Sequence, residues 1–201
     1  LEFLFCFSMH ISKEALRKHF DPRMYPNETY LLCKLQWNGS KKYWIHWVRN
    51  CNHDYHDYHD YHDYHDYHNY CCYHAEEYFL EDIFEPRSYN FCTMTWYLSF
   101  SPCWKCCNKI WDFLKRQPNV RIDIHVARIF HSDSAENRSA LRKLNSLQRL
   151  NYLASISPDY RDCWKTFIHR GVNNIFLPEN FESEIRRNRL RLKNILQVST
   201  L

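Results

Sequence analysis

The sequence predicts an α/β domain in which one mixed β-sheet lies between two layers of helices. Its 201 residues suffice for one domain with a full hydrophobic core and are too few for two comfortable ones. With 45% hydrophobic and 25% charged residues, the composition is typical of soluble globular proteins. Strand-like and helix-like segments alternate along the chain, about five strands with about six helices, which predicts a three-layer α/β/α architecture.

The first 50 residues predict a helix followed by a β-hairpin. Residues 11–20 have amphipathic helical spacing, and Asp21-Pro22 ends the helix. Residues 30–36 and 43–49 are rich in aromatic and other strand-forming residues. Asn38-Gly39 between them is a common hairpin turn, so the two strands are expected to pair.

The middle of the chain predicts a helix, a strand and a second helix. Residues 73–84 contain good helix formers and stop before Pro86. Residues 91–98 predict a strand. Pro102 is well placed to open a helix that runs to about Gln117, where Pro118-Asn119 ends it.

The last third of the chain completes the alternation. We expect a strand over 122–129, a helix over 135–150, a strand over 152–157, and helices over 159–169 and 181–197. The helix over 135–150 is expected because leucines recur there at helical spacing: Leu141, Leu144, Leu147 and Leu150.

Residues 53–70 form a repeat, HDYHDYHDYHDYHDYHNY, with six histidines, five aspartates and no lysine or arginine. Its period of three matches neither a strand nor a helix, and it has no aliphatic residue with which to build a core. We interpret it as a disordered, solvated insertion in a single domain that spans residues 1–201. The repeat is expected to have no function; as an alternative, its histidines bind metal and the chain is a metal-loading or interaction protein.

Composition excludes several classes of function. The two glycines, Gly39 and Gly171, are too few for the phosphate-binding loops of nucleotide enzymes. No stretch of eighteen apolar residues is present, so no membrane partner is expected, and residues 1–9 lack the basic region and cleavage site of a secretory signal. Ten cysteines without such a signal favour metal ligands over a disulfide framework.

The formal net charge of +4 conceals an uneven distribution. Without the five aspartates of the repeat, the chain has 27 basic against 18 acidic residues, a net charge of +9. That surplus favours a polyanionic partner. The helix predicted at the C-terminal end contributes much of it, either as a solvated face or as a nucleic-acid contact, through Arg186, Arg187, Arg189, Arg191 and Lys193.

The motifs H-A-E at 74–76 and P-C-W-K-C at 102–106 predict a catalytic zinc site. Each motif begins a predicted helix, and one strand separates them, so the two helix N-termini are expected to lie together. His74, Cys103 and Cys106 then supply three ligands of a tetrahedral zinc ion and leave a fourth position for water. The positive end of a helix also favours the thiolates that zinc requires.

Glu76 is expected to transfer protons beside this zinc, as hydrolytic deamination requires. The pattern H-x-E…P-C-x-x-C is the known signature of zinc nucleobase deaminases. The alternative is a structural zinc site completed by Cys107 or Cys72, in which Glu76 only stabilises its helix.

Over about residues 11–197, the chain resembles the AID/APOBEC family of polynucleotide cytidine deaminases. Besides the zinc motif, the resemblance rests on six segments: ETYLLC at 28–33, WVRN at 47–50, TWYLSFSPC at 95–103, VARIF at 126–130, ENR at 136–138 and DCWKTF at 162–167. The family implies the cytidine deaminase fold, a five-stranded sheet flanked by six helices. It also implies one Zn²⁺ per chain and conversion of cytosine to uracil in single-stranded DNA or RNA.

The resemblance also implies a substrate pocket. Its expected members are Asn27, Thr29, Asn50, Ala75, Phe100, Ser101, Arg128, Phe130 and His131. Phe100 stands where the family usually has tryptophan, and Phe130 matches an aromatic that stacks on the target base. His131 begins a loop that selects the nucleotide 5′ to the target. For either phenylalanine, core packing is the alternative to base stacking.

The family further implies a cytoplasmic and nuclear location, with an RNA-targeting protein partner and a homodimer left open. Two other functions stay open: a zinc-containing nucleic-acid-binding module without turnover, and a free-nucleoside deaminase. The repeat lies between Asn50 and His74, so its aspartates are expected to repel substrate phosphates. We therefore expect weak substrate affinity that improves near pH 6, where the histidines become charged.

Overall fold

The computed structural model describes residues 10–38, 40–50, 74–86, 90–147, 150–154, 157–168 and 181–197. The repeat at 53–70, Cys72 and residues 1–9 lie outside the described residues. Five strands form one sheet, β1 (Tyr30–Trp37), β2 (Trp44–Arg49), β3 (Cys92–Leu98), β4 (Val120–Val126) and β5 (Leu150–Ala154). Their order is β2-β1-β3-β4-β5, antiparallel between β2, β1 and β3 and parallel from β3 to β5, so the predicted five-stranded mixed sheet is confirmed.

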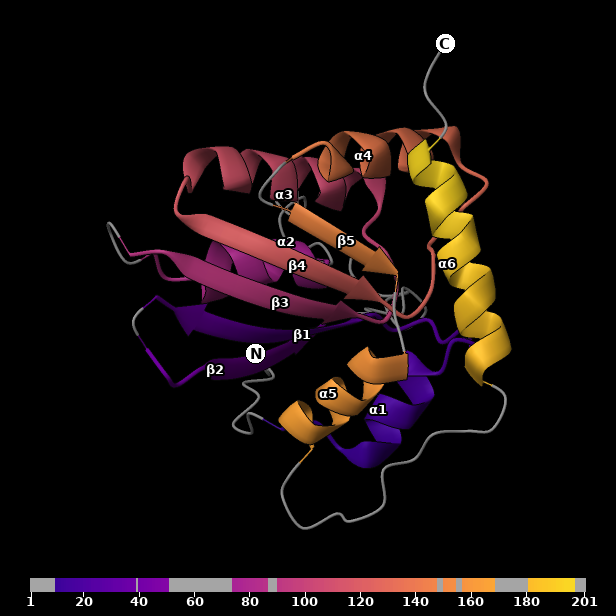
Figure 1. Ribbon diagram of the computed structural model, residues 1–201, viewed down its shortest axis with the longest axis horizontal. Coiled ribbons are helices and arrows are strands. Elements are labelled where there is room, and N and C mark those ends of the chain that lie inside the picture. The colour runs from indigo at the N-terminus through magenta and orange to yellow at the C-terminus, as the bar shows by residue number, and fades with distance from the viewer. Residues whose placement is uncertain are drawn as a thin grey trace, which may run out of the picture.

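Helices cover both faces of this sheet (Figure 1). They are α1 (Lys13–Phe20), α2 (Ala75–Tyr78), α3 (Trp104–Arg116), α4 (Ala135–Asn145), α5 (Ser157–Phe167) and α6 (Phe181–Gln197). Figure 1 shows α2, α3 and α4 on one side of the sheet and α1 with α5 on the other. The predicted three-layer α/β/α fold is therefore confirmed.

Alternation along β1 shows how the sheet fills two cores. Leu31, Cys33 and Leu35 pack into the cluster that includes Ile110 and Leu114 of α3. Their neighbours Tyr30 and Leu32 point to the opposite face and join a cluster formed with α1 and α5. Because side chains of a strand alternate between faces and both faces are covered here, the buried first half of β1, residues 30–33, is apolar at every position.

Helix α6 joins the two cores at the sheet's end. Its first turns contribute Phe181 and Ile185 to the α1/α5 cluster, and its last turns contribute Leu192 and Ile195 to the α3/α4 cluster. The side-chain amide of Asn188 donates to the carbonyl of Ala127, directly after β4.

Several element boundaries differ from the prediction; β5, for example, covers Leu150–Ala154, where a strand over 152–157 was expected. Strand β4 begins at Val120 and ends at Val126, because the turn at 117–120 leads straight into pairing with Cys92. Helix α4 ends at Asn145, and Leu150 lies in β5, where it pairs with Ile122; its helical spacing from Leu147 was therefore misleading. Helix α2 is a single turn that continues as a π-helical segment, Phe79–Ile83.

The six cysteines within the described residues are free thiols. Within the same residues, no helix has the length and apolar character needed to cross a membrane.

Candidate active site

The starts of α2 and α3 bring His74, Cys103 and Cys106 together. His74 precedes α2, Cys103 precedes α3, and Cys106 lies in the first turn of α3. The Nδ1 atom of His74 lies 3.2 Å from the Cys106 sulfur and 3.5 Å from the Cys103 sulfur. All three donor atoms lie within 4.8 Å of one another, and no other group of this kind occurs among the described residues.

This geometry fits a zinc ion. Ligand bonds of about 2.0–2.3 Å in a tetrahedral site place the ligand atoms about 3.3–3.8 Å apart, close to the distances from His74 to the two thiols. One imidazole and two thiols also form a ligand set that binds zinc, whereas calcium and magnesium prefer oxygen ligands. The predicted ligands are therefore placed together, and the cluster can hold a metal.

A third cysteine, next to the cluster in the sequence, has a different environment. The Cys107 sulfur is buried, and its contact is with the carbonyl of Pro102 at 3.7 Å. Cys107 does not belong to the group of donor atoms formed by His74, Cys103 and Cys106. The structure therefore does not support Cys107 as the fourth ligand of a structural site; Cys72, the other candidate, is outside the described residues.

Proton sharing among these side chains polarises the cluster. The hydrogen bond from Cys106, together with His74, lowers the pKa of the Cys103 thiol to about 4. The same bond and burial raise the pKa of Cys106, and the bond to Cys103 raises the pKa of His74. These interactions favour the thiolate form of Cys103, and a divalent cation would favour deprotonation of the second thiol.

Glu76 lies beside this cluster on the second residue of α2. Its side chain is only 8% exposed, and its Oε2 atom lies 3.6 Å from the Cys106 sulfur. Burial raises the pKa of this carboxyl. A buried carboxyl adjacent to a metal-binding cluster is suited to accepting and returning protons, in line with its predicted role.

Thr29 and Asn50, two of the expected pocket residues, are hydrogen-bonded to each other. The backbone N–H of Thr29 donates to the Asn50 side chain at 2.8 Å, and the backbone N–H of Asn50 donates to the Thr29 carbonyl at 3.0 Å. The adjacent residue Tyr30 donates to the hydroxyl of Ser99, which directly precedes Phe100. Asn27 lies exposed in the same loop as Thr29.

Four ring-bearing residues from three segments form what we call the aromatic surface: Tyr25, Phe100, Phe130 and His131. The Phe100 ring lies 6.3 Å from Phe130 and 6.5 Å from Tyr25, and Phe130 lies 4.3 Å from His131. Phe100 and Phe130 are only partly buried, while Tyr25 is 68% exposed. Exposed ring faces of this kind are able to stack on nucleobases.

Tyr25 was missed by the sequence reasoning. It lies in the loop after α1, between Pro22 and Pro26 and outside any strand pattern. In such a loop, the residues next to a tyrosine in the sequence do not bury its ring. This position was the sequence signal that the Tyr25 ring is available for binding. Only the folded chain shows which rings it faces.

Arg128 is placed differently from the expected substrate contact. The residue is 1% exposed, and its guanidinium donates to the backbone carbonyls of His19, Asp21, Met24 and Ser99. It also lies 4.2 Å beneath the Phe100 ring. Burial lowers the pKa of Arg128 to about 10, which leaves it charged at neutral pH. We therefore assign Arg128 to holding the loop of Tyr25 against the aromatic surface, in place of contacting substrate.

Two further expected pocket residues are buried. The Ser101 hydroxyl accepts a hydrogen bond from the backbone N–H of Phe130 at 2.9 Å, so its side chain orients the aromatic surface. Ala75, between His74 and Glu76, packs into the hydrophobic core.

His131, another expected pocket residue, is exposed and has a positive φ of 39°, an uncommon conformation for a residue other than glycine.

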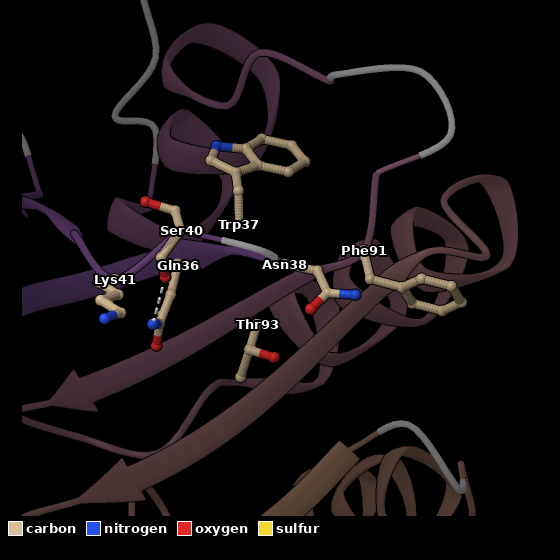
Figure 2. Close-up of a pocket in the computed structure, with 7 residues that line it drawn as sticks. All are labelled: Gln36, Trp37, Asn38, Ser40, Lys41, Phe91 and Thr93. Carbon is tan, nitrogen blue, oxygen red and sulfur yellow. Dashed lines mark hydrogen bonds between the residues drawn. The ribbon is translucent and has the colours of Figure 1, made fainter.

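A separate cavity of about 500 Å³ lies at the opposite end of β3 (Figure 2). Its lining consists of Gln36, Trp37, Asn38, Ser40, Lys41, Phe91 and Thr93. These residues include no histidine, cysteine or carboxylate that could bind a metal or accept a proton. The cavity therefore lacks the groups that chemistry at a metal site requires, and its volume alone does not identify it as the active site.

The chain is similar in sequence to known deaminases. The family model described as "APOBEC4-like -AID/APOBEC-deaminase" matches residues 55–170, more than half of the chain. The chain is 32% identical over 158 residues to the "C->U-editing enzyme APOBEC-1" of Mus musculus, covering 77% of this chain and 60% of that protein. It is 30% identical over 154 residues to the Homo sapiens protein of the same name, covering 75% and 56%.

A shorter match, 33% identical over 92 residues, joins the chain to the "DNA dC->dU-editing enzyme APOBEC-3G" of Pongo pygmaeus, covering 44% of this chain and 24% of that protein. The chain thus spans 60% or less of the length of these relatives. The residues that the family model matches, 55–170, include both motifs of the metal cluster. This protein belongs to the AID/APOBEC deaminase family.

Proposed function

We propose that this protein is a zinc-dependent deaminase that hydrolyses cytosine to uracil in single-stranded nucleic acid. The observation that carries the proposal is the cluster of His74, Cys103 and Cys106 with the buried carboxyl of Glu76 beside it. Zinc held by the imidazole and the two thiols supplies the Lewis acidity that makes water a nucleophile at neutral pH.

Glu76 carries the proton transfers in this proposal. Hydrolysis adds water to the ring carbon that bears the amino group and releases ammonia, so protons must move from the water to the leaving nitrogen. Glu76 accepts a proton on its carboxylate and returns it to that nitrogen. Its burial excludes bulk water from this exchange.

The aromatic surface supports a nucleic-acid substrate. Tyr25, Phe100 and Phe130 present ring faces from three separate loops, and each stacked base contributes about 1–3 kcal/mol of binding free energy. A free nucleoside has a single base and does not need rings spread over three segments. The names of the relatives, which specify C-to-U and dC-to-dU editing, favour cytosine as the target base.

The exposed face of α6 supports a polyanion. All five of its basic residues from 186 to 193 are exposed: Arg186, Arg187, Arg189, Arg191 and Lys193. The helix contacts the segment after β4 through Asn188 and Ala127, close to the residues that lead to Phe130. Through contacts with phosphates, these cations would bind a nucleic acid of any base sequence, and the binding would weaken as the salt concentration rises.

The test compares the wild-type protein with Glu76→Gln on single-stranded DNA and RNA oligonucleotides that contain cytosine in mixed contexts. We expect Glu76→Gln to bind one zinc per chain and to lose about 10²–10⁴-fold in kcat, the usual contribution of a positioned acid–base group. The matched control is Glu77→Gln, the adjacent carboxyl, which pairs with Lys109 at 2.7 Å and should leave kcat unchanged.

Equal conversion by Glu76→Gln and the wild type would refute the role of Glu76. No conversion by folded, zinc-loaded wild-type protein would refute the enzyme and favour a nucleic-acid-binding module. Which oligonucleotide reacts, and in which context, identifies the preferred nucleic acid and the flanking base.

A further inference from the structure

The helix that carries both thiols begins without a cap of its own. Cys103 is the N-cap residue of α3, but its side chain makes no capping hydrogen bond, because its sulfur faces His74. The first backbone N–H groups of a helix have no partner within the helix, and a serine, threonine, aspartate or asparagine at the N-cap normally accepts one of them. A metal ligand at this position cannot do both.

Asn137 supplies the missing acceptor from another helix. Its side-chain oxygen accepts the backbone N–H of Trp104, the first residue of α3, at 2.9 Å. Asn137 lies in the first turn of α4 and is only 4% exposed. The contact therefore closes the N-terminus of α3 across the boundary between two helices.

Asn137 is itself held in place. Its backbone N–H donates to the hydroxyl of Ser134, the N-cap of α4, at 3.2 Å. The next residue, Arg138, donates to the carbonyls of Ser132 and Asp133 at 3.1 and 2.6 Å. The same turn of α4 thus contacts the start of α3 and orders the loop that follows His131.

We propose that Asn137 is a positioning residue that caps α3 through the Trp104 amide, and so holds Cys103 and Cys106 in their metal-binding geometry. Cys103 directly precedes Trp104, and Cys106 follows it by two residues, so the capped amide lies between the two ligands. Contacts behind metal ligands typically change metal affinity or activity by about 10–100-fold when removed.

For turnover this inference rests on the proposed deaminase function, but for metal retention it does not. The experiment therefore uses full-length, zinc-loaded protein and follows loss of zinc to an excess of a chelator. We expect Asn137→Ala to lose zinc about 10–100-fold faster than the wild type. Asn137→Asp keeps an acceptor oxygen and should restore retention to within about threefold of the wild type.

The matched control is Asn188→Ala. Asn188 is also a buried asparagine whose side chain bonds one backbone group, the Ala127 carbonyl at 3.3 Å, but it lies on α6. If Asn137 acts only through general stability, both alanine variants will lose zinc at similar rates, and the proposal is overturned. It is also overturned if Asn137→Asp loses zinc as fast as Asn137→Ala.

A second measurement does not depend on how well the variants fold. Hydrogen exchange of the Trp104 amide in the wild-type protein should be slow, and in folded Asn137→Asp it should stay slow. Exchange at the rate of an open chain in the wild type would refute the cap. In the deamination assay, Asn137→Ala should lower kcat and leave KM nearly unchanged, since Asn137 orders ligands and touches no base. If the wild type retains zinc but converts nothing, the deaminase proposal fails while the zinc-loss comparison still decides the role of Asn137.

Discussion

Both ends of strand β3 have aromatic rings nearby, but the two ends differ in chemistry. At the start of β3, Phe91 is 61% exposed and lines a cavity with Trp37 and polar side chains (Figure 2). Beyond its end lie Phe100, the metal-binding cluster and the buried carboxyl of Glu76. The first end has a cavity, but the reactive groups are found at the other end.

The physical reason is the direction of the chain. Strands β3 and β4 are parallel, so both end at the same edge of the sheet, and the segments that follow them lie together. α3 begins at this edge, and its positive N-terminal end favours thiolates. At the opposite edge, β3 and β4 begin next to the turn between β1 and β2. The start of β3 and this turn form a cavity but do not supply a helix N-terminus that favours thiolates. A cavity alone is therefore a poor guide to where catalysis occurs in this fold.

We call the end of β3 that lies near the metal-binding cluster and Glu76 the reactive end. The largest effect is expected from removing a metal ligand there. Cys106→Ala removes a ligand and should leave the protein unable to retain zinc or to deaminate any oligonucleotide. Its neighbour Cys107, buried against the Pro102 carbonyl, is the control; Cys107→Ala should still bind one zinc and turn over. Metal analysis and a deamination assay on both variants make the comparison. Loss of zinc in Cys107→Ala would instead revive a four-ligand structural site.

The next effect compares the aromatic rings of the two ends. Phe130→Leu keeps an apolar side chain but removes a stacking face, and should raise KM by about 5- to 150-fold, equivalent to 1–3 kcal/mol per stacked base. Phe91→Leu makes the same change at the cavity end and should leave KM unchanged. Steady-state kinetics on a single-stranded oligonucleotide measures both. Equal effects of the two substitutions would place substrate contacts at the cavity end as well.

A smaller effect is expected from the acidic repeat, which follows Asn50 and precedes His74 in the sequence. Deleting residues 53–70 removes five negative charges from the connection between two segments of the reactive end. Affinity for a single-stranded oligonucleotide should rise by about 3- to 10-fold at low salt, and the gain should shrink as salt screens the charges. In the intact protein, binding should also strengthen from pH 7.5 to 6 as the histidines become charged.

Equal affinities of the two proteins at low salt would contradict a repulsive role for the repeat. A flat binding curve between pH 7.5 and 6 would count against the histidine contribution.

The smallest effect concerns stability at the reactive end. Burial lowers the pKa of His19, with Lys18 and Arg128 adding to the shift and Glu28, 3.3 Å away, opposing it. The unfolded chain therefore binds this proton more readily than the folded one. The stability gained at neutral pH is lost as the pH falls below the ordinary histidine pKa of about 6.5.

His19→Gln stays neutral at every pH and should reduce the fall in Tm between pH 7.5 and 5.5. Both proteins are measured with excess zinc, so that metal release affects them alike. His46, whose pKa burial also lowers, is present in both and cancels in the comparison. Identical Tm changes in the two proteins would show that His19 does not contribute to acid sensitivity.

The fold and the metal cluster could be predicted from the sequence because their signals are local. Period-two and period-3.6 patterns mark the strands and helices, and each cluster motif lies within one helix start. Glu76 is two residues from His74, and Cys106 is three from Cys103. Since a strand between two such helices brings their starts together, the spacing alone predicts that the ligands meet.

Contacts between distant segments could not be predicted in this way. Arg128 matched a family pattern, but only the folded chain shows its guanidinium bonded to carbonyls more than 100 residues earlier. Tyr25 and Asn137 carry no local pattern for facing Phe100 or capping α3. Such contacts depend on how loops and helices pack against the sheet, because a side chain's partners are set by three-dimensional neighbours and not by spacing along the chain.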